Sequence, residues 1–138
     1  MHNDDKTLTI LDCLFENNGG PVSGCAVSND SGHIKIENTV FKANGLVKGL
    51  NDGGAIHNNL GKIDLIDCSF LENQCDGSCG AIANIDGEIF VKNCRFAGNV
   101  SGNYGGAIYN KNGIINSLNS DFKNNSVEYR MYTVVYYG

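Results

Sequence analysis

The sequence has little positive charge and no long apolar run. Its 10 lysines and arginines face 15 aspartates and glutamates, so the net charge is −5, and its only arginines are Arg95 and Arg130. A nucleic-acid-binding protein would show a basic stripe, so we expect no nucleic-acid partner. No stretch is long and apolar enough to span a membrane, and residues 1–6 lack the charged-then-apolar pattern of a signal peptide.

A helical pattern of apolar residues is missing as well. No segment keeps apolar residues at positions i, i+3 and i+4, and β-branched and aromatic residues dominate the apolar set. The apolar residues alternate instead, as Ile63 and Leu65 do within residues 61–65. A period of two is typical of strands, so the sequence predicts an all-β fold without helices.

Two short motifs recur along the chain at a fixed interval. The phenylalanines of the Phe-x-x-Asn motif are spaced by 26, 29, 26 and 26 residues, and a Gly-Ala-Ile-x-Asn motif keeps the same spacing. A fixed period of this size is typical of repeat folds in which equivalent residues stack on one another. The predicted stacked residues are Phe15, Asn18, Phe41, Asn44, Phe70, Asn73, Phe96, Asn99, Phe122, Asn125, Ala26, Ala55, Ala81 and Ala107.

Each repeat also contains predicted corners between its strands. An Asp or Asn stands where the alternation slips, from Asp12 in the first repeat to Asn119 in the last, and both residue types tolerate left-handed backbone. The glycine before Ala55, Ala81 and Ala107 suits a strained turn. Three short strands per 26-residue repeat predict a parallel β-helix of about five coils, right-handed by the usual preference of crossover connections.

Five of the six cysteines fall into two groups by position. Cys13, Cys68 and Cys94 share one predicted inward row, so we expect small buried side chains there. Stacked strands lie about 4.8 Å apart, which is wider than the roughly 3.5–4.5 Å between the Cβ atoms of a disulfide. Cys75 and Cys79 could close a local disulfide or form half of a metal site. A zinc site needs a second ligand pair, and none is evident, so we predict no metal and no cofactor.

An enzymatic site on a β-helix would need clustered carboxylates on one outward face. Asp12 and Asp67 share a corner row, but a coil that carries an asparagine separates them. We therefore predict a protein without catalytic residues. The alternative is a polysaccharide-active β-helix enzyme or its remnant, which a lateral groove with two carboxylates, or with a carboxylate and Arg95, would favour.

Candidate binding residues lie where the repeat is variable or interrupted. His57 and Tyr109 belong to a predicted outward row in which the side chains differ from coil to coil. The second coil is expanded by three residues within 44–52, and insertions in solenoids form surface loops that often bind partners. The candidate contact residues of this loop are Leu46, Val47 and Leu50.

The two ends of the chain depart from the repeat. Residues 123–138 form a degenerate last coil that is rich in tyrosine, which indicates an aromatic binding strip, a degenerate repeat, a cap or a truncated reading frame. At the other end, Met1 stands in mid-repeat without a capping element, and solenoids need capped ends. We therefore expect residues 1–138 to be a single β-helix domain that is a fragment of a longer chain.

Together the two motifs resemble the paired repeat motifs of the polymorphic outer membrane proteins of chlamydiae. They also resemble the adhesin-like β-helix proteins of methanogenic archaea and other host-associated microbes. The pairs that carry the resemblance are Phe41–Asn44 with Gly53–Ile56, Phe70–Asn73 with Gly80–Ile82, and Phe96–Asn99 with Gly105–Ile108.

The resemblance covers nearly the whole chain, although Cys25 replaces a glycine in the first repeat and the last repeat keeps only Phe122–Asn125. It implies a right-handed β-helix of the pectin-lyase type that is exported to the cell surface and acts in display or adhesion. The implied partner is a protein or glycan on the surface of a host or neighbouring cell, and no catalytic residues are implied.

Overall fold

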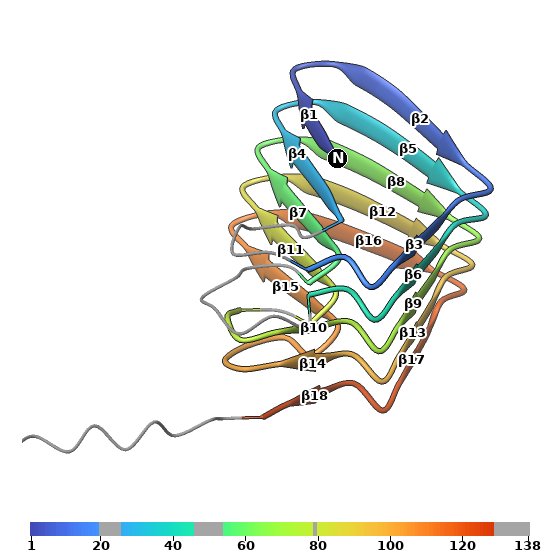
Figure 1. Ribbon diagram of the computed structural model, residues 1–138. Coiled ribbons are helices and arrows are strands. Elements are labelled where there is room, and N and C mark those ends of the chain that lie inside the picture. The colour runs from blue at the N-terminus through green and yellow to red at the C-terminus, as the bar shows by residue number, and fades with distance from the viewer. Residues whose placement is uncertain (20–25, 46–53, 79, 129–138) are drawn as a thin grey trace, which may run out of the picture.

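The protein winds as a β-solenoid of stacked coils. The computed structural model describes residues 1–19, 26–45, 54–78 and 80–128. All regular elements in these ranges are strands, and all pairs are parallel. Equivalent strands of successive coils lie above one another, as Figure 1 shows, which confirms the predicted parallel β-helix. No helix in the described ranges has the length and apolar character to cross a membrane.

Two five-stranded sheets form two sides of the solenoid. Their strands alternate buried and less buried residues, because every second side chain points into the coil. The first sheet contains β1 (His2–Asp4), β4 (Val27–Asp30), β7 (Ile56–Asn59), β11 (Ile82–Ile85) and β15 (Ile108–Lys111). The second sheet contains β2 (Thr7–Leu11), β5 (His33–Glu37), β8 (Lys62–Ile66), β12 (Glu88–Lys92) and β16 (Ile114–Leu118).

A third five-stranded sheet and a fourth three-stranded sheet complete the coils. The third sheet contains β3 (Leu14–Glu16), β6 (Val40–Lys42), β9 (Ser69–Leu71), β13 (Arg95–Ala97) and β17 (Asp121–Lys123). The fourth sheet contains β10 (Gln74–Cys75), β14 (Val100–Ser101) and β18 (Ser126–Val127). Only three strands per coil are predicted from the sequence. The fourth sheet escapes prediction because a two-residue strand is too short to show alternation.

The interior consists of rows of equivalent side chains. The five repeat phenylalanines stack with ring centroids 4.7–4.9 Å apart and nearly parallel planes, close to the strand spacing of about 4.8 Å. Phe41, Phe70 and Phe96 are completely buried, and the alanine row from Ala26 to Ala107 is buried as well. The stacking predicted from the two motifs is therefore present.

Two rows of asparagines run along the solenoid inside the coils. In each row the side-chain nitrogen donates to the side-chain oxygen of the next asparagine, at 2.7–3.0 Å. The first ladder also donates to the backbone carbonyl three residues later, and the second to the carbonyl of a phenylalanine in the preceding coil. The first ladder is Asn3, Asn29, Asn58, Asn84 and Asn110, and the second is Asn18, Asn44, Asn73, Asn99 and Asn125.

Left-handed residues make the corners, and three such rows occur among the described residues. The predicted Asx row has φ values between 49° and 54°, which confirms its role as the corner between the second and third sheets. The other two rows are less uniform, since they include Leu60, Ala43 and Glu72 at φ values of 59°, 52° and 55°. Non-glycine residues rarely adopt this conformation, so these corners are held by the stacked coils around them.

The glycines of the repeat serve a different purpose from the predicted one. Gly54, Gly80 and Gly106 stand before the alanine row, where a strained turn was expected, yet none of them has a positive φ. A Cβ at Gly54 would meet the carbonyl oxygen of Gly80, and one at Gly80 would meet that of Gly106. Close approach of the next coil, rather than a left-handed turn, therefore requires glycine here.

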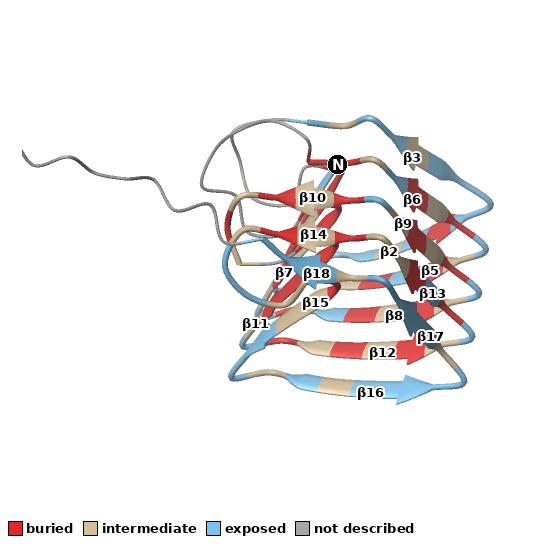
Figure 2. Ribbon diagram, turned by 90° about the horizontal axis from the view of Figure 1, so that it is seen from below, coloured by how far each residue is buried: buried red, intermediate tan, exposed pale blue. Residues whose placement is uncertain are grey.

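Burial falls towards both ends of the solenoid. Figure 2 shows strands of the middle coils largely buried and the end strands β16 and β17 exposed. Phe122 is 46% exposed. Cys13 is exposed too, so the prediction of a buried thiol at this position is wrong. Cys13 belongs to the first coil, which is covered on one side only, whereas Cys68 and Cys94 of the middle coils are buried as expected.

Candidate functional site

A groove follows the corner between the first and second sheets across the stacked coils. Its volume is about 550 Å³, within the range of roughly 300–1,000 Å³ that is common for ligand sites. We call it the corner groove. It is lined by three equivalent residues from each coil, and the lining residues are Asp5, Lys6, Thr7, Ser31, Gly32, His33, Leu60, Gly61, Lys62, Asp86, Gly87, Glu88, Asn112, Gly113 and Ile114.

The floor of the corner groove is a row of glycines that the first asparagine ladder requires. A Cβ at Gly61 would collide with the side-chain nitrogen of Asn29 and lie 2.7 Å from the carbonyl oxygen of Gly32. Gly87 is confined in the same way by Asn58 and by the carbonyl of Gly61. Because no side chain fits at these positions, the corner remains hollow between its two walls.

The walls of the corner groove carry charges of both signs. One wall is the left-handed row, which contains Asp5 and Asp86. The other wall is formed by the first residues of the strands of the second sheet, where Lys62 and Glu88 are register partners. Among the described residues, the charged groups of these four side chains take part in no salt bridge. They are therefore available to a ligand.

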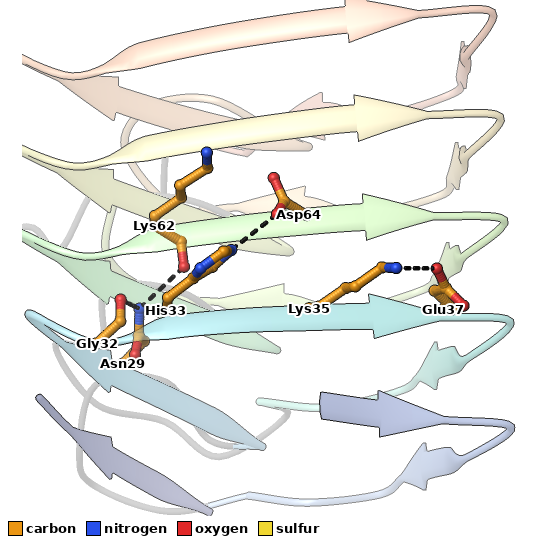
Figure 3. A network of polar contacts seen from close by, with 7 residues as sticks. All are labelled: Asn29, Gly32, His33, Lys35, Glu37, Lys62 and Asp64. Carbon is orange, nitrogen blue, oxygen red and sulfur yellow. Dashed lines mark hydrogen bonds and ion pairs between the residues drawn. The ribbon is translucent and has the colours of Figure 1, made fainter. Parts of the chain in front are cut away.

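Next to the corner groove, the outer face of the second sheet carries charged pairs. The imidazole of His33 lies 2.8 Å from the carboxylate of Asp64, and the Lys35 ammonium lies 2.8 Å from the Glu37 carboxylate. Figure 3 shows both pairs on the same face of the sheet. The hydrogen bond that the Lys35 ammonium donates to the Glu37 carboxylate raises the pKa of Lys35.

The predicted outward row lies on the first sheet, outside the corner groove. His57 on β7 and Tyr109 on β15 are both half-buried, and Ala83 between them is completely buried. The ring of Tyr109 stacks on that of Tyr104 with centroids 5.7 Å apart, and Tyr104 is 58% exposed. A binding role for His57 and Tyr109 remains a prediction.

Several predicted residues lie outside the described ranges. These residues are Leu46, Val47 and Leu50 of the expanded coil, Cys79 of the possible local disulfide, and the tyrosine-rich residues 129–138.

The two buried thiols of the inward row, Cys68 and Cys94, are held by hydrogen bonds to the backbone. Cys68 and Cys94 are not joined by a disulfide, as the strand spacing predicts. The thiols donate to backbone carbonyls at 3.2 Å, of Ile66 and Lys92 respectively. The hydrogen bond with Cys94 and the burial of the site raise the pKa of Cys68, so its reactive thiolate form is disfavoured.

Two neighbouring carboxylates line the corner groove, away from the corner row of Asp12 and Asp67 that the sequence brings into consideration. Asp86 and Glu88 flank Gly87 there, whereas Arg95 lies on the outer face of the third sheet with Asp121 as its register partner. Within the described ranges, no three His, Cys, Asp or Glu side chains are grouped closely enough to hold a metal ion.

The corner groove itself is not predicted from the sequence. The feature of the sequence that marks the corner groove is a row of glycines that keeps the repeat interval while the residues on either side of it vary. These glycines are Gly32, Gly61, Gly87 and Gly113. A row of missing side chains between two variable rows marks a hollow on the surface. That inference requires knowing that the glycines lie over a ladder of asparagines and carry no positive φ.

One coil of the solenoid matches a described repeat. Residues 93–111 match the family model of the Chlamydia polymorphic membrane protein repeat. This stretch begins at the corner residue Asn93, includes Phe96–Asn99 and Gly105–Ile108, and ends at Lys111. The match contains both motifs that carry the resemblance and confirms it for this repeat. No curated protein and no solved structure matches the chain.

Proposed function

We propose that this chain is a β-helix segment of an adhesin-like protein at the cell surface, where it displays binding residues and attaches to a partner. The observation that carries the proposal is the polymorphic membrane protein repeat at residues 93–111, which contains strands β13, β14 and β15 of a regular solenoid. The proposed partner is a protein or glycan on the surface of a host or neighbouring cell. The proposed location is extracellular or at the cell envelope.

The architecture supports this proposal by separating scaffold from surface. The interior rows are occupied by nearly invariant Phe, Asn, Gly and Ala residues that stacking requires. The outer rows vary in charge and size, because a side chain that points to solvent does not have to fill a fixed space between stacked coils. Such a solenoid can present different surfaces on one scaffold, as an adhesive display module requires.

Binding of the purified chain to cells tests the proposal. Beads coated with the folded chain should adhere to cultured animal or bacterial cells, and free chain should compete for the same sites. Beads coated with the heat-unfolded chain are the matched control. Adherence of the folded chain that never exceeds this control, on animal and bacterial cells alike, would contradict the proposal.

A second candidate function is supported by one feature of the corner groove. Asp86 and Glu88 lie on opposite walls on either side of Gly87, and glycoside hydrolysis uses two carboxylates as acid and base or nucleophile. Release of reducing ends from polysaccharides by the wild-type chain, lost in Asp86→Asn and in Glu88→Gln, would favour this enzyme. Absence of any release by the folded wild-type chain would count against it.

A further inference from the structure

The corner groove combines a hollow with charged groups that the fold does not use. Salt bridges join Lys35 to Glu37 and Lys42 to Glu16 outside the groove, and His33 of the groove lining pairs with Asp64. Within the described residues, Lys62 and the carboxylates of the groove have no such partners. These charges of the groove therefore form no salt bridge within the described scaffold and are accessible to a ligand.

The mixture of signs restricts the chemistry of that ligand. Asp5, Asp86 and Glu88 supply three carboxylates, against the ammonium groups of Lys6 and Lys62. A polyanion such as a sulfated glycan would meet the carboxylates at close range, and like charges repel. Carboxylates accept hydrogen bonds and ammonium groups donate them, so together they suit hydroxyl groups, which do both.

The backbone around the corner groove does not offer hydrogen bonds to an added peptide strand. The amide groups of His33, Lys62, Glu88 and Ile114 each donate to a carbonyl of the preceding coil at 2.9 Å. Addition of a strand needs a free sheet edge, which the middle of a stacked solenoid lacks. Recognition in the groove must therefore come from side chains.

Apolar side chains complete the walls at two of the coils. Leu60 and Ile114 are each 60% exposed, and both line the groove beside its polar groups. Exposed aliphatic groups of this kind can contact the C–H faces of a sugar ring. The floor glycines from Gly32 to Gly113 span four coils, which corresponds to about 14 Å at the usual strand spacing, so the groove admits an elongated ligand that lies along the solenoid axis.

We propose that the corner groove binds a neutral, linear oligosaccharide, with the sugar hydroxyls held between the carboxylates of Asp86 and Glu88 and the ammonium group of Lys62. This inference rests on the proposed adhesive function, and it names the binding site and the chemical class of the partner. It assigns binding to residues outside the predicted row of His57 and Tyr109.

A paired set of double variants tests the assignment. The groove variant, Lys62→Ala with Asp86→Ala, removes one positive and one negative charge from the groove. The β17 variant, Asp121→Ala with Lys123→Ala, removes one charge of each sign from the exposed strand β17. Both changes are at exposed positions and should alter the free energy of unfolding by less than about 0.5 kcal/mol. Circular dichroism during urea unfolding checks that both variants remain folded.

The binding measurement uses an array of short neutral oligosaccharides of glucose, galactose, mannose and N-acetylglucosamine, with sulfated glycans and unrelated peptides on the same slide. Wild-type chain and the β17 variant should bind the same neutral glycans. The groove variant should bind at least about tenfold more weakly, because hydrogen bonds to charged groups are worth about 1.5–3 kcal/mol each.

Any of three results would overturn the inference: a groove variant that binds as strongly as wild type, neutral spots that stay blank, or sulfated glycans or peptides as the preferred ligands. Blank neutral spots together with persistent adherence to cells would remove the glycan assignment and leave the adhesive function in place. Blank spots together with absent adherence would remove both.

Discussion

The interior ladders and the walls of the corner groove are neighbours in the chain, yet they follow different rules. Asn58 and Asn84 are identical and stacked, whereas Leu60 and Asp86, two residues further along, form equivalent corner positions with unrelated side chains. An inward residue must fit the same residue in the coils above and below it. An outward residue also has neighbours in the adjacent coils, but its side chain extends into solvent and does not have to fill a fixed space. Stacking therefore restricts the sequence inside the coil and leaves the surface open to function.

The largest expected effect comes from removing a phenylalanine in the middle of the interior stack. Phe70→Ala leaves a cavity between two buried rings and should lower the free energy of unfolding by about 3–5 kcal/mol. Phe122→Ala at the exposed end of the same stack should cost only about 1 kcal/mol, because nearly half of its side chain is exposed already. Urea denaturation of both variants measures the difference. Equal losses would show that the stack does not distinguish middle coils from end coils.

Breaking an asparagine ladder should have the next largest effect. In Asn73→Ala, both the backbone and side-chain nitrogens of Asn44 lose their acceptor, and the carbonyl of Phe41 loses its donor. Buried unsatisfied groups cost about 1–3 kcal/mol each, so we expect a loss of about 3 kcal/mol.

Asn116→Ala is the surface control for the ladder variant, since Asn116 is exposed on β16. Its free energy of unfolding should stay within about 0.5 kcal/mol of wild type. A ladder variant as stable as this control would contradict the view that the asparagines serve as scaffold.

The floor of the groove provides a third comparison, between two kinds of glycine. Gly61→Ala forces a methyl group against Asn29 and should cost about 1–3 kcal/mol through overpacking. Gly98→Ala has room for its methyl group but keeps a φ of +67°, so it should cost about 1 kcal/mol. Gly98→Asn should recover most of that loss, because asparagine tolerates left-handed backbone, whereas Gly61→Asn should recover nothing. Thermal unfolding of the four variants separates the two causes.

The smallest expected effect is a gain at a variable corner. Glu72 has a φ of 55° and is exposed, so Glu72→Asn should raise the free energy of unfolding by about 0.5–1 kcal/mol. Glu72→Gln keeps the left-handed cost and should leave the urea midpoint unchanged. A gain of equal size in both variants would point to charge rather than backbone conformation.

The parts of the fold that could be predicted from the sequence are those that stacking repeats. The Phe and Asn rows recur at one interval, so their position inside a coil follows from periodicity alone. The left-handed row from Asp12 to Asn119 is also predicted, because Asp and Asn carry a local conformational preference. The exposed Cys13 was missed, since periodicity assigns a residue to a row but does not say whether a coil covers it.

The corner groove could not be predicted because it results from contacts between coils. Glycine is consistent with either a left-handed turn or a close approach, and only the position of Asn29 relative to Gly61 decides between them. The unpaired state of Lys62 and Asp86 is likewise a matter of three-dimensional position. Candidate residues selected for their chemistry alone, such as His57, therefore fell outside the groove.

The side-chain amide dipoles of the two asparagine ladders point in the same direction along the solenoid axis. Every amide in both ladders donates from one coil to the following coil in the chain, so their dipoles add instead of cancelling, and hydrogen bonds in such a chain polarise one another. Each coil therefore presents acceptor oxygens on the side of the preceding coil and donor nitrogens on the side of the following coil. A coil inserted in the reverse orientation would bring like atoms together, so growth of such a stack is possible in one polarity only.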